Sequence, residues 1–116
     1  MQAQALKKHI RSSPRKMRLV IDLIRGKKAG EALNILHFNA KHAASDAENV
    51  LKSAVSNLQA KQKADGINVN VDDIFVKEVF VNCGPMVKRI LPAPMGRAYR
   101  VRKRSNHLTI IVATKD

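Results

Sequence analysis

Five cationic side chains occur within eight residues near the C-terminus, and this run limits how the chain can fold more than any other feature. Successive side chains of an extended strand point to opposite faces. Arg100, Arg102 and Arg104 therefore share one face. Arg97 and Lys103 share the other. Because a strand with charge on both faces cannot lie on an apolar core, the segment must project into solvent or into something anionic.

The basic run lies within a longer stretch, Asn82 to Asn106, which is too long for an ordinary hairpin loop. Pro92 and Pro94 lack the N–H that a strand ladder needs, so regular pairing should fail around the tip. About ten to twelve extended residues would reach roughly 35 Å from the body. We expect the apolar residues of this stretch to contact a partner or line a cavity rather than fold back. They are Met86, Val87, Ile90, Leu91 and Met95.

The balance of charge indicates a polyanionic partner. The chain has 116 residues, with 22 Lys and Arg against 9 Asp and Glu, which gives a net charge of +13. The basic residues concentrate in 1–28 and 79–115, whereas most acids lie between these segments. Such crowding destabilises a compact protein unless a polyanion neutralises it. Nucleic acid is a better candidate than a membrane surface, because the expected helices have core-like stripes without tryptophan anchors.

Apolar periodicity predicts three helices. A serine cap and Pro14 begin the first, which is expected to end at Gly26. A second helix is expected from about 28 to 36. Asn39 is expected to cap the third, whose alanine-rich stripe is the strongest periodic signal in the chain and ends near Lys63.

The remaining segments favour strands. Residues 2–10 predict a short strand. The β-branched and aromatic residues of 69–81 and 107–113 predict two strands that pair antiparallel. The length allows one domain over residues 1–116, with the projecting arm at about 82–106.

The sequence has no strong motif for catalysis, and we expect neither an enzyme nor a bound metal or cofactor. Lys27 is followed by Lys28 where a phosphate-binding loop needs Ser or Thr. His37 and His42 do not share a helix face, which disfavours a zinc pair. The single Cys83 allows no internal disulfide and suits a reducing compartment. The chain has one Tyr and three Phe, which disfavours a base-stacking platform. We therefore expect it to recognise RNA through phosphates, 2′-hydroxyls and shape.

Two motifs resemble one known family. The stretch Ser12–Lys27 resembles the opening helix motif of the large-subunit ribosomal protein twenty-two family, of bacterial type. Gly84–Pro92, Gly96–Ala98 and Arg102–Ile110 are similar to the long hairpin and closing strand of that family. The resemblance covers nearly the whole chain, and the order of the hairpin elements is highly specific.

The resemblance implies an α+β fold, with three helices packed on a small three-stranded antiparallel sheet and a long protruding β-hairpin. It implies a structural constituent of the large ribosomal subunit that binds 23S-type rRNA and supports subunit assembly, with a hairpin tip that lines the peptide exit tunnel. The implied partners are neighbouring large-subunit proteins, including ribosomal protein four at the tunnel, and the nascent peptide. The implied location is cytoplasmic and ribosome-bound, with an organellar ribosome left open.

The charge pattern and the resemblance together give two sets of expected site residues. The expected rRNA-binding residues are Lys7, Lys8, Arg11, Arg15, Lys16, Arg18, Arg25, Lys27, Lys28, Lys88, Arg89, Arg97, Arg100, Arg102, Lys103, Arg104 and His107. The expected tunnel-lining residues are Lys88, Arg89, Ile90, Leu91, Pro92, Ala93, Pro94, Met95 and Gly96. Ala93 and Met95 stand where many bacterial relatives have basic residues.

Two other functions fit parts of the sequence. An architectural DNA-binding protein would use the arm in the minor groove, with Pro92 and Pro94 as a wedge. A small metal-dependent nuclease would use Asp72, Asp73 and Glu78. Adjacent carboxylates point to opposite faces of a strand, however, so a solvated turn before a strand is the better interpretation of the aspartates. Competition by duplex DNA and metal-dependent RNA cleavage would distinguish these alternatives.

Overall fold

Three antiparallel strands form the central sheet, in the order β1-β5-β2. The computed structural model describes residues 1–66, 71–92, 96 and 98–114. The strands are β1 (Gln2–Ile10), β2 (Ile74–Cys83) and β5 (Asn106–Thr114). β5 is rich in β-branched residues, which suit a pleated and buried surface, and it pairs with a neighbour on each side. The expected antiparallel pairing of the two strand-forming runs is confirmed.

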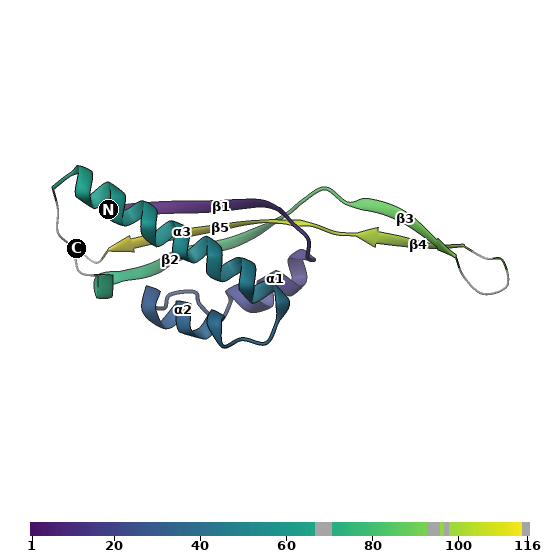
Figure 1. Cartoon of the computed structure of the whole chain (residues 1–116), viewed down its shortest axis with the longest axis horizontal. Coiled ribbons are helices and arrows are strands. Elements are labelled where there is room, and N and C mark those ends of the chain that lie inside the picture. Colours follow the sequence, from purple (N-terminus) through teal and green to yellow (C-terminus); the bar gives the residue numbers. More distant parts are fainter. Residues whose placement is uncertain (67–70, 93–95, 97, 115–116) are drawn as a thin grey trace.

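Three helices pack on one face of this sheet (Figure 1). They are α1 (Pro14–Ile21), α2 (Ala29–His37) and α3 (His42–Ala64). The α+β fold implied by the family resemblance, with three helices on a three-stranded antiparallel sheet, is confirmed. No helix in the described ranges is long and apolar enough to cross a membrane.

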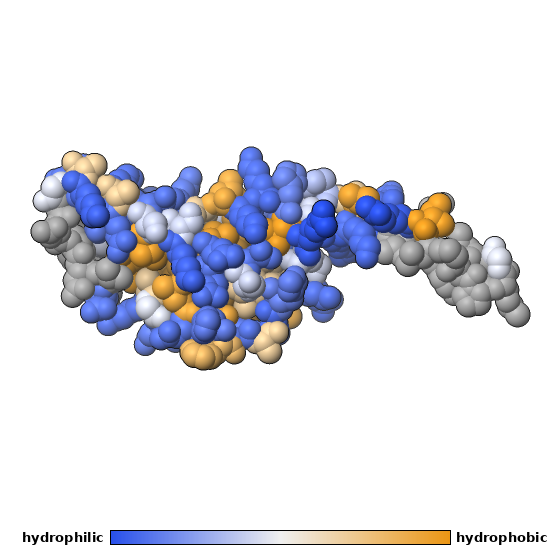
Figure 2. Space-filling model, in the orientation of Figure 1, coloured by the Kyte–Doolittle hydropathy of each residue, from blue (hydrophilic) through white to orange (hydrophobic). Residues whose placement is uncertain are grey.

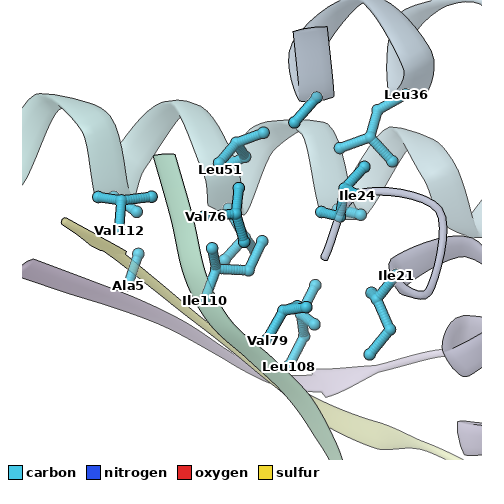
Figure 3. Packing of buried hydrophobic residues seen from close by; sticks show 14 of the residues in the cluster. Ala5, Ile21, Ile24, Leu36, Leu51, Val76, Val79, Leu108, Ile110 and Val112 are labelled. Atoms are coloured by element: carbon cyan, nitrogen blue, oxygen red, sulfur yellow. The ribbon is translucent and has the colours of Figure 1, made fainter. Parts of the chain in front are cut away.

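The hydrophobic core lies between the helices and this face of the sheet (Figure 3). Ala5, Ile110 and Val79 form one row across the three strands, and all three are buried. Ile21 of α1 and Leu51 of α3 belong to the same cluster. Full burial of a large aliphatic side chain contributes about 1.5–3 kcal/mol, so this cluster is what holds the body together.

Two arginines of the α1 segment cover the outer edge of β2. A guanidinium nitrogen of Arg18 donates to the carbonyl of Val81 at 3.2 Å. A guanidinium nitrogen of Arg25 donates to the carbonyl of Val79 at 3.0 Å. An edge strand leaves such carbonyls without a strand partner, and these bonds satisfy them.

Polar side chains of α3 cover the outer edge of β1 in the same way. The amide nitrogen of Asn57 donates to the carbonyl of Gln4, and the ammonium of Lys61 donates to the carbonyl of Gln2, each at 3.0 Å. Both edges of the sheet are therefore partly closed by side chains from α1, from the turn after α1 and from α3.

α1 ends at Ile21, not at Gly26 as the periodicity predicts. The N–H of Ile24 bonds to the carbonyl of Ile21 at 3.1 Å in a tightened turn, which keeps the Ile24 side chain in the core. Gly26, at φ +77°, then donates its N–H to the carbonyl of Val76 at 3.2 Å. Pairing with the edge of β2 replaces the last helical turn because it satisfies backbone groups of both segments.

Two other element starts differ from the predictions. Lys41 occupies the N-cap position of α3 and makes no capping hydrogen bond with its side chain. The side chain of Asn39 instead accepts a hydrogen bond from the Lys41 N–H at 2.9 Å, in a local turn before the helix. β2 begins at Ile74. The sequence predicted that this strand starts at residue 69. Residues 67–70 lie outside the described part of the chain, and Val71–Asp73 form a short 3₁₀ helix, η1.

A separate two-stranded ribbon makes up the arm. β3 (Val87–Pro92) pairs antiparallel with β4 (Ala98–Lys103), and Figure 1 shows the ribbon extending away from the helices. The molecule measures 67 × 25 × 15 Å, and its radius of gyration of 17.6 Å exceeds the roughly 13 Å of a compact chain of this length. Pairing continues to Pro92, whereas the predicted effect of Pro94 falls outside the described residues.

The core and the arm should respond differently to the same substitution. Ile110→Ala removes a fully buried side chain, and we expect it to lower the free energy of unfolding by about 2–5 kcal/mol, measured by urea denaturation. Ile90→Ala is the matched control, because Ile90 lies in the arm and is 70% exposed. That variant should change stability by less than about 0.5 kcal/mol. Equal effects of the two substitutions would contradict this description of the core.

Candidate nucleic-acid interface

The arm joins the body at a narrow crossing of two chain segments, residues 84–86 and 104–105, which we call the neck. The N–H of Gly84 donates to the carbonyl of Ser105 at 3.0 Å, and the hydroxyl of Ser105 donates to the carbonyl of Pro85 at 2.6 Å. A β-carbon on Gly84 would lie 2.5 Å from Ser105 Oγ and 3.2 Å from its backbone carbonyl. A β-carbon at position 84 would therefore require Ser105 to move.

A buried asparagine ties the neck to the start of α1. The Asn106 side chain is fully buried, and its amide nitrogen donates to the carbonyl of Ser12 at 2.9 Å and to the Ser12 hydroxyl at 2.7 Å. The next residue, Ser13, caps α1 by accepting a hydrogen bond from the Lys16 N–H at 3.3 Å. The base of the arm and the basic N-terminal segment thus form one polar junction.

A bulge brings the end of β1 to the same place. Pairing of β1 with β5 shifts register between Lys7 and Ile10, and His9 adopts φ +58°. The backbone N–H of His9 donates to Nδ1 of His107 at 3.1 Å, and the two rings pack edge to face with centroids 5.0 Å apart. After this bulge Ile10 pairs with Asn106 beside the neck, and Arg11 follows directly after the end of β1.

These segments enclose a basic groove of about 710 Å³ at the neck, which we call the neck groove. Its lining residues are His9, Arg11, Ser13, Pro85, Val87, Arg89, Arg102, Lys103, Arg104 and Ser105. One cation comes from the N-terminal segment and four come from the arm. Figure 2 shows hydrophilic side chains crowding the surface where the arm leaves the body. The groove thus brings together basic segments from opposite ends of the sequence.

No carboxylate forms an ion pair with a cation of the neck groove among the residues that the structure describes. Several acids bind elsewhere. Asp46 pairs with Lys7 at 2.8 Å. Glu48 lies 3.2 Å from the Lys52 ammonium, whose hydrogen bond is the main cause of a lowered pKa at Glu48. The positive charge of the groove is therefore left for an external anion.

The pairing of β3 with β4 adds to this charge. Lys88 lies directly opposite Arg102 in the antiparallel register, and both side chains are exposed. Like charges directly opposite one another destabilise a strand pair. A phosphate beside both side chains would offset that repulsion, so the ribbon itself favours an anionic ligand.

Apolar side chains of the arm are exposed. Ile90 is 70% exposed, and Met86 and Val87 are each about half exposed. These three side chains do not fold back on the body, which agrees with the expectation that they face a partner or a cavity. For Leu91 the structure describes only the backbone position, in β3, and Met95 lies outside the described residues.

Three of the expected rRNA-binding cations make contacts within the protein. Arg18 and Arg25 bind carbonyls of β2, and Arg25 also pairs with Asp22 at 2.7 Å. Lys7 pairs with Asp46. Their charges therefore serve the body of the protein at least in part.

The other expected site residues occupy three kinds of position. Exposed on the body, outside the lining of the neck groove, are Lys8, Arg15, Lys16, Lys27 and Lys28. Arg100 and Pro92 are placed by the backbone of the arm, and Gly96 follows at φ +72°. Outside the described residues are Ala93, Pro94 and Arg97.

The neck contains residues that the sequence analysis missed. His9, Ser13, Pro85 and Ser105 line the groove, although none was expected to bind a partner, whereas Val87 was expected to contact a partner or line a cavity. The flanking Gly84-Pro85 was a signal for a close approach of backbone, because glycine permits it. Nothing in the sequence marked the turn at His9.

The structure gives little support to a metal-dependent nuclease. Among the described residues, no group of three or more His, Cys, Asp or Glu side chains is placed to hold a metal ion. Asp72 and Asp73 are exposed in η1 immediately before β2, which is the expected turn before a strand.

Comparison with known proteins gives a family for this fold and basic arm. Residues 5–113 match the family model described as ribosomal protein L22p/L17e. The chain belongs to this family. It is 54% identical over 114 residues to the large ribosomal subunit protein uL22 of Chlorobium phaeobacteroides (strain BS1), covering 98% of this chain and 96% of that protein.

Two further relatives carry the same name in other bacteria. The uL22 protein of Chlorobaculum tepidum is 54% identical over 112 residues, covering 97% of this chain and 92% of the relative. That of Solibacter usitatus is 48% identical over 116 residues, covering 100% and 99%. The resemblance identified from the helix and hairpin motifs is confirmed.

The close approach at Gly84 predicts a specific effect of a single methyl group. Gly84→Ala should lower the free energy of unfolding by about 1–3 kcal/mol, because Ser105 must move to make room. Urea denaturation measures the loss, and backbone amide shifts at residues 104–106 report the displacement.

Gly30→Ala is the matched control for this prediction. Nothing lies within 4 Å of a β-carbon at Gly30, which is in α2, so this substitution should be neutral or stabilising by up to about 1 kcal/mol. If Gly84→Ala were as well tolerated, with unchanged amide shifts at the neck, the crossing would not need glycine.

Proposed function

We propose that this chain is a structural, non-enzymatic constituent of the large ribosomal subunit and that it binds the rRNA of that subunit. The observation that carries the proposal is the neck groove, where five cations meet without a carboxylate partner in the described part of the chain. Membership of the ribosomal protein L22p/L17e family supports RNA as the polyanion.

Binding through the groove acts by neutralising and positioning phosphates. Each phosphate that meets a lysine or arginine releases condensed counterions. Arginine can also hold two phosphate oxygens at once, which fixes orientation as well as charge. Because Arg11 and the run from Arg102 to Arg104 are joined through the neck, RNA that contacts both is held at one junction. This is how the protein would support subunit assembly.

The interface extends from the groove in both directions. Toward the body it includes exposed cations of β1 and α1, such as Lys8 and Lys16. Along the arm it includes Lys88 and the position of Arg100 opposite Ile90. Arg18 and Arg25 contribute to the RNA-binding surface only through the guanidinium N–H groups that do not bond to carbonyls of β2.

We propose in addition that the tip of the arm, residues 88–96, lines the peptide exit tunnel. The arm accounts for much of the 67 Å length of the molecule, and its exposed Ile90 has no packing partner on the body. The proposed neighbours there are other large-subunit proteins, including ribosomal protein four, and the nascent peptide.

Salt dependence tests the RNA proposal. The triple variant Arg11→Gln, Arg102→Gln and Arg104→Gln should bind large-subunit rRNA more weakly. The slope of log K against log salt should flatten by about 2 to 3, because each lost phosphate contact removes about 0.7–0.9. Filter binding across a salt series measures both quantities.

A charge-matched control tests whether the change in slope depends on the groove or only on the loss of net charge. Lys41→Gln, Lys52→Gln and Lys63→Gln remove three exposed cations of the α3 segment, outside the groove. This control should retain nearly the wild-type slope. Equal slopes for the two triple variants would refute the groove as the binding element, and efficient displacement of rRNA by duplex DNA would favour the minor-groove alternative.

Cross-linking tests the tunnel proposal. Ile90→Cys in a Cys83→Ser background, assembled into ribosomes, should cross-link to a stalled nascent chain that carries a thiol-reactive group. The native Cys83 must be replaced because it is exposed. Leu19→Cys in the same background is the control, since Leu19 is exposed on α1 and should give no cross-link. A cross-link at position 90 no stronger than that at position 19 would contradict the proposal that the tip lines the tunnel.

A further inference from the structure

One face of the central sheet has no helix on it. The helices pack on the side of Ala5, Val79 and Ile110. On the opposite side, Thr109 of β5 lies directly across from both Leu6 of β1 and Phe80 of β2. We call this the open face, and its central row is Leu6, Thr109 and Phe80.

The two outer residues of the central row are apolar and accessible. Leu6 is 50% exposed and Phe80 is 40% exposed, whereas Thr109 between them is buried. Phe75 and Ile111, farther along the same face, are half-buried. The solvent side of an antiparallel sheet normally carries polar side chains. The exposed aromatic ring of Phe80 on such a face therefore indicates a contact that the isolated chain does not make.

The open face is continuous with the neck groove. His107, paired with Asn82, occupies the next position beside Thr109 on the same face of β5. Its ring packs against His9, which lines the groove. Residues two apart on a strand are separated by about 7 Å. A strand of RNA with phosphates in the groove can therefore reach the central row within about one or two nucleotides.

We propose that an unpaired nucleobase of the bound RNA stacks on the ring of Phe80, with Leu6 closing the other side of the row. This inference rests on the proposed function, because the phosphates of the same RNA lie in the neck groove. Aromatic rings on a helix-free sheet face are how single-stranded RNA is commonly bound. Charge favours RNA over a protein partner here, because the groove beside His9 carries five cations and pairs with none of the acids described.

The acid on this face lies away from the proposed contact. Glu78 is paired with Ile111, which puts it on the far side of the central row from His107 and the neck. RNA approaching from the groove reaches Phe80 first. The scarcity of aromatic residues argued against a platform for several bases, and the open face agrees with that argument because it offers one accessible ring in its central row.

A fluorescent base tests the stack directly. A short single-stranded RNA containing 2-aminopurine is titrated with the full chain, because stacking quenches the fluorescence of this base. Phe80→Leu keeps an apolar side chain but removes the ring, and we expect it to abolish most of the quenching and to weaken binding roughly tenfold, with an unchanged salt slope. Phe80→Tyr keeps the ring and should retain the quenching.

Phe38→Leu is the matched control. Phe38 is 82% exposed and packs edge to face on His37 at the end of α2, away from the open face, so its replacement should leave both quenching and affinity at wild-type values. Urea denaturation establishes that Phe80→Leu is folded. If it is not, the Phe80→Tyr variant still decides the question, as does recovery of fluorescence in the wild-type complex when free nucleobase is added as a competitor.

The outcomes separate this inference from the proposed function. If the groove variants flatten the salt slope but Phe80→Leu quenches and binds like the wild type, the stack is wrong and RNA binding by the groove stands. If wild-type protein neither binds nor quenches the RNA, both proposals fail. If Phe80→Leu binds RNA normally yet is incorporated poorly into large subunits, the open face contacts a protein, and the RNA assignment is overturned.

Discussion

The contact between Gly84 and Ser105 determines where the arm can point. The described side chains of β3 and β4, at 87–90 and 102–103, are all exposed, so we expect the direction of the ribbon to depend on how the two segments leave the body. At the neck these segments are joined by a backbone hydrogen bond of 3.0 Å and lie closer than a β-carbon permits. Asn106, fully buried beside them, fixes the same point to Ser12. These contacts at the neck thus fix the direction of the arm relative to the central sheet.

Positive charge gathers at this junction. The N-terminal segment and the arm both end at the neck, and after the bulge at His9 the N-terminal segment pairs with Asn106 there. Described acids bind lysines and arginines of the body instead, as Asp46 and Asp22 do. A fold that keeps its carboxylates away from a cationic groove is well suited to a partner made of phosphates, because no internal ion pair has to be broken when the partner binds.

Sequence patterns predicted the parts of the structure that depend on periodicity. The alternation of Leu108, Ile110 and Val112 placed these side chains on one buried face, and the alanine-rich stripe gave α3. The two-sided charge of the arm and the hairpin motifs led to the family. These features depend on local geometry, which a sequence records directly.

Long-range contacts account for what the patterns missed. The first helix ends early because Gly26 pairs with Val76, a residue far along the chain. Arg18 looked like part of a binding surface because a sequence shows the sign of a charge but not which carbonyl it meets. The neck groove has the same origin, since its residues become neighbours only after the sheet has formed.

Closure of the sheet edges has a consequence for the newly made chain. An open edge invites the addition of a strand from another copy, which leads to aggregation. Asn57 and Lys61 on one side, and Arg18 and Arg25 on the other, occupy carbonyls that such a strand would need. These side chains therefore oppose the addition of a strand from another copy at either edge of the sheet.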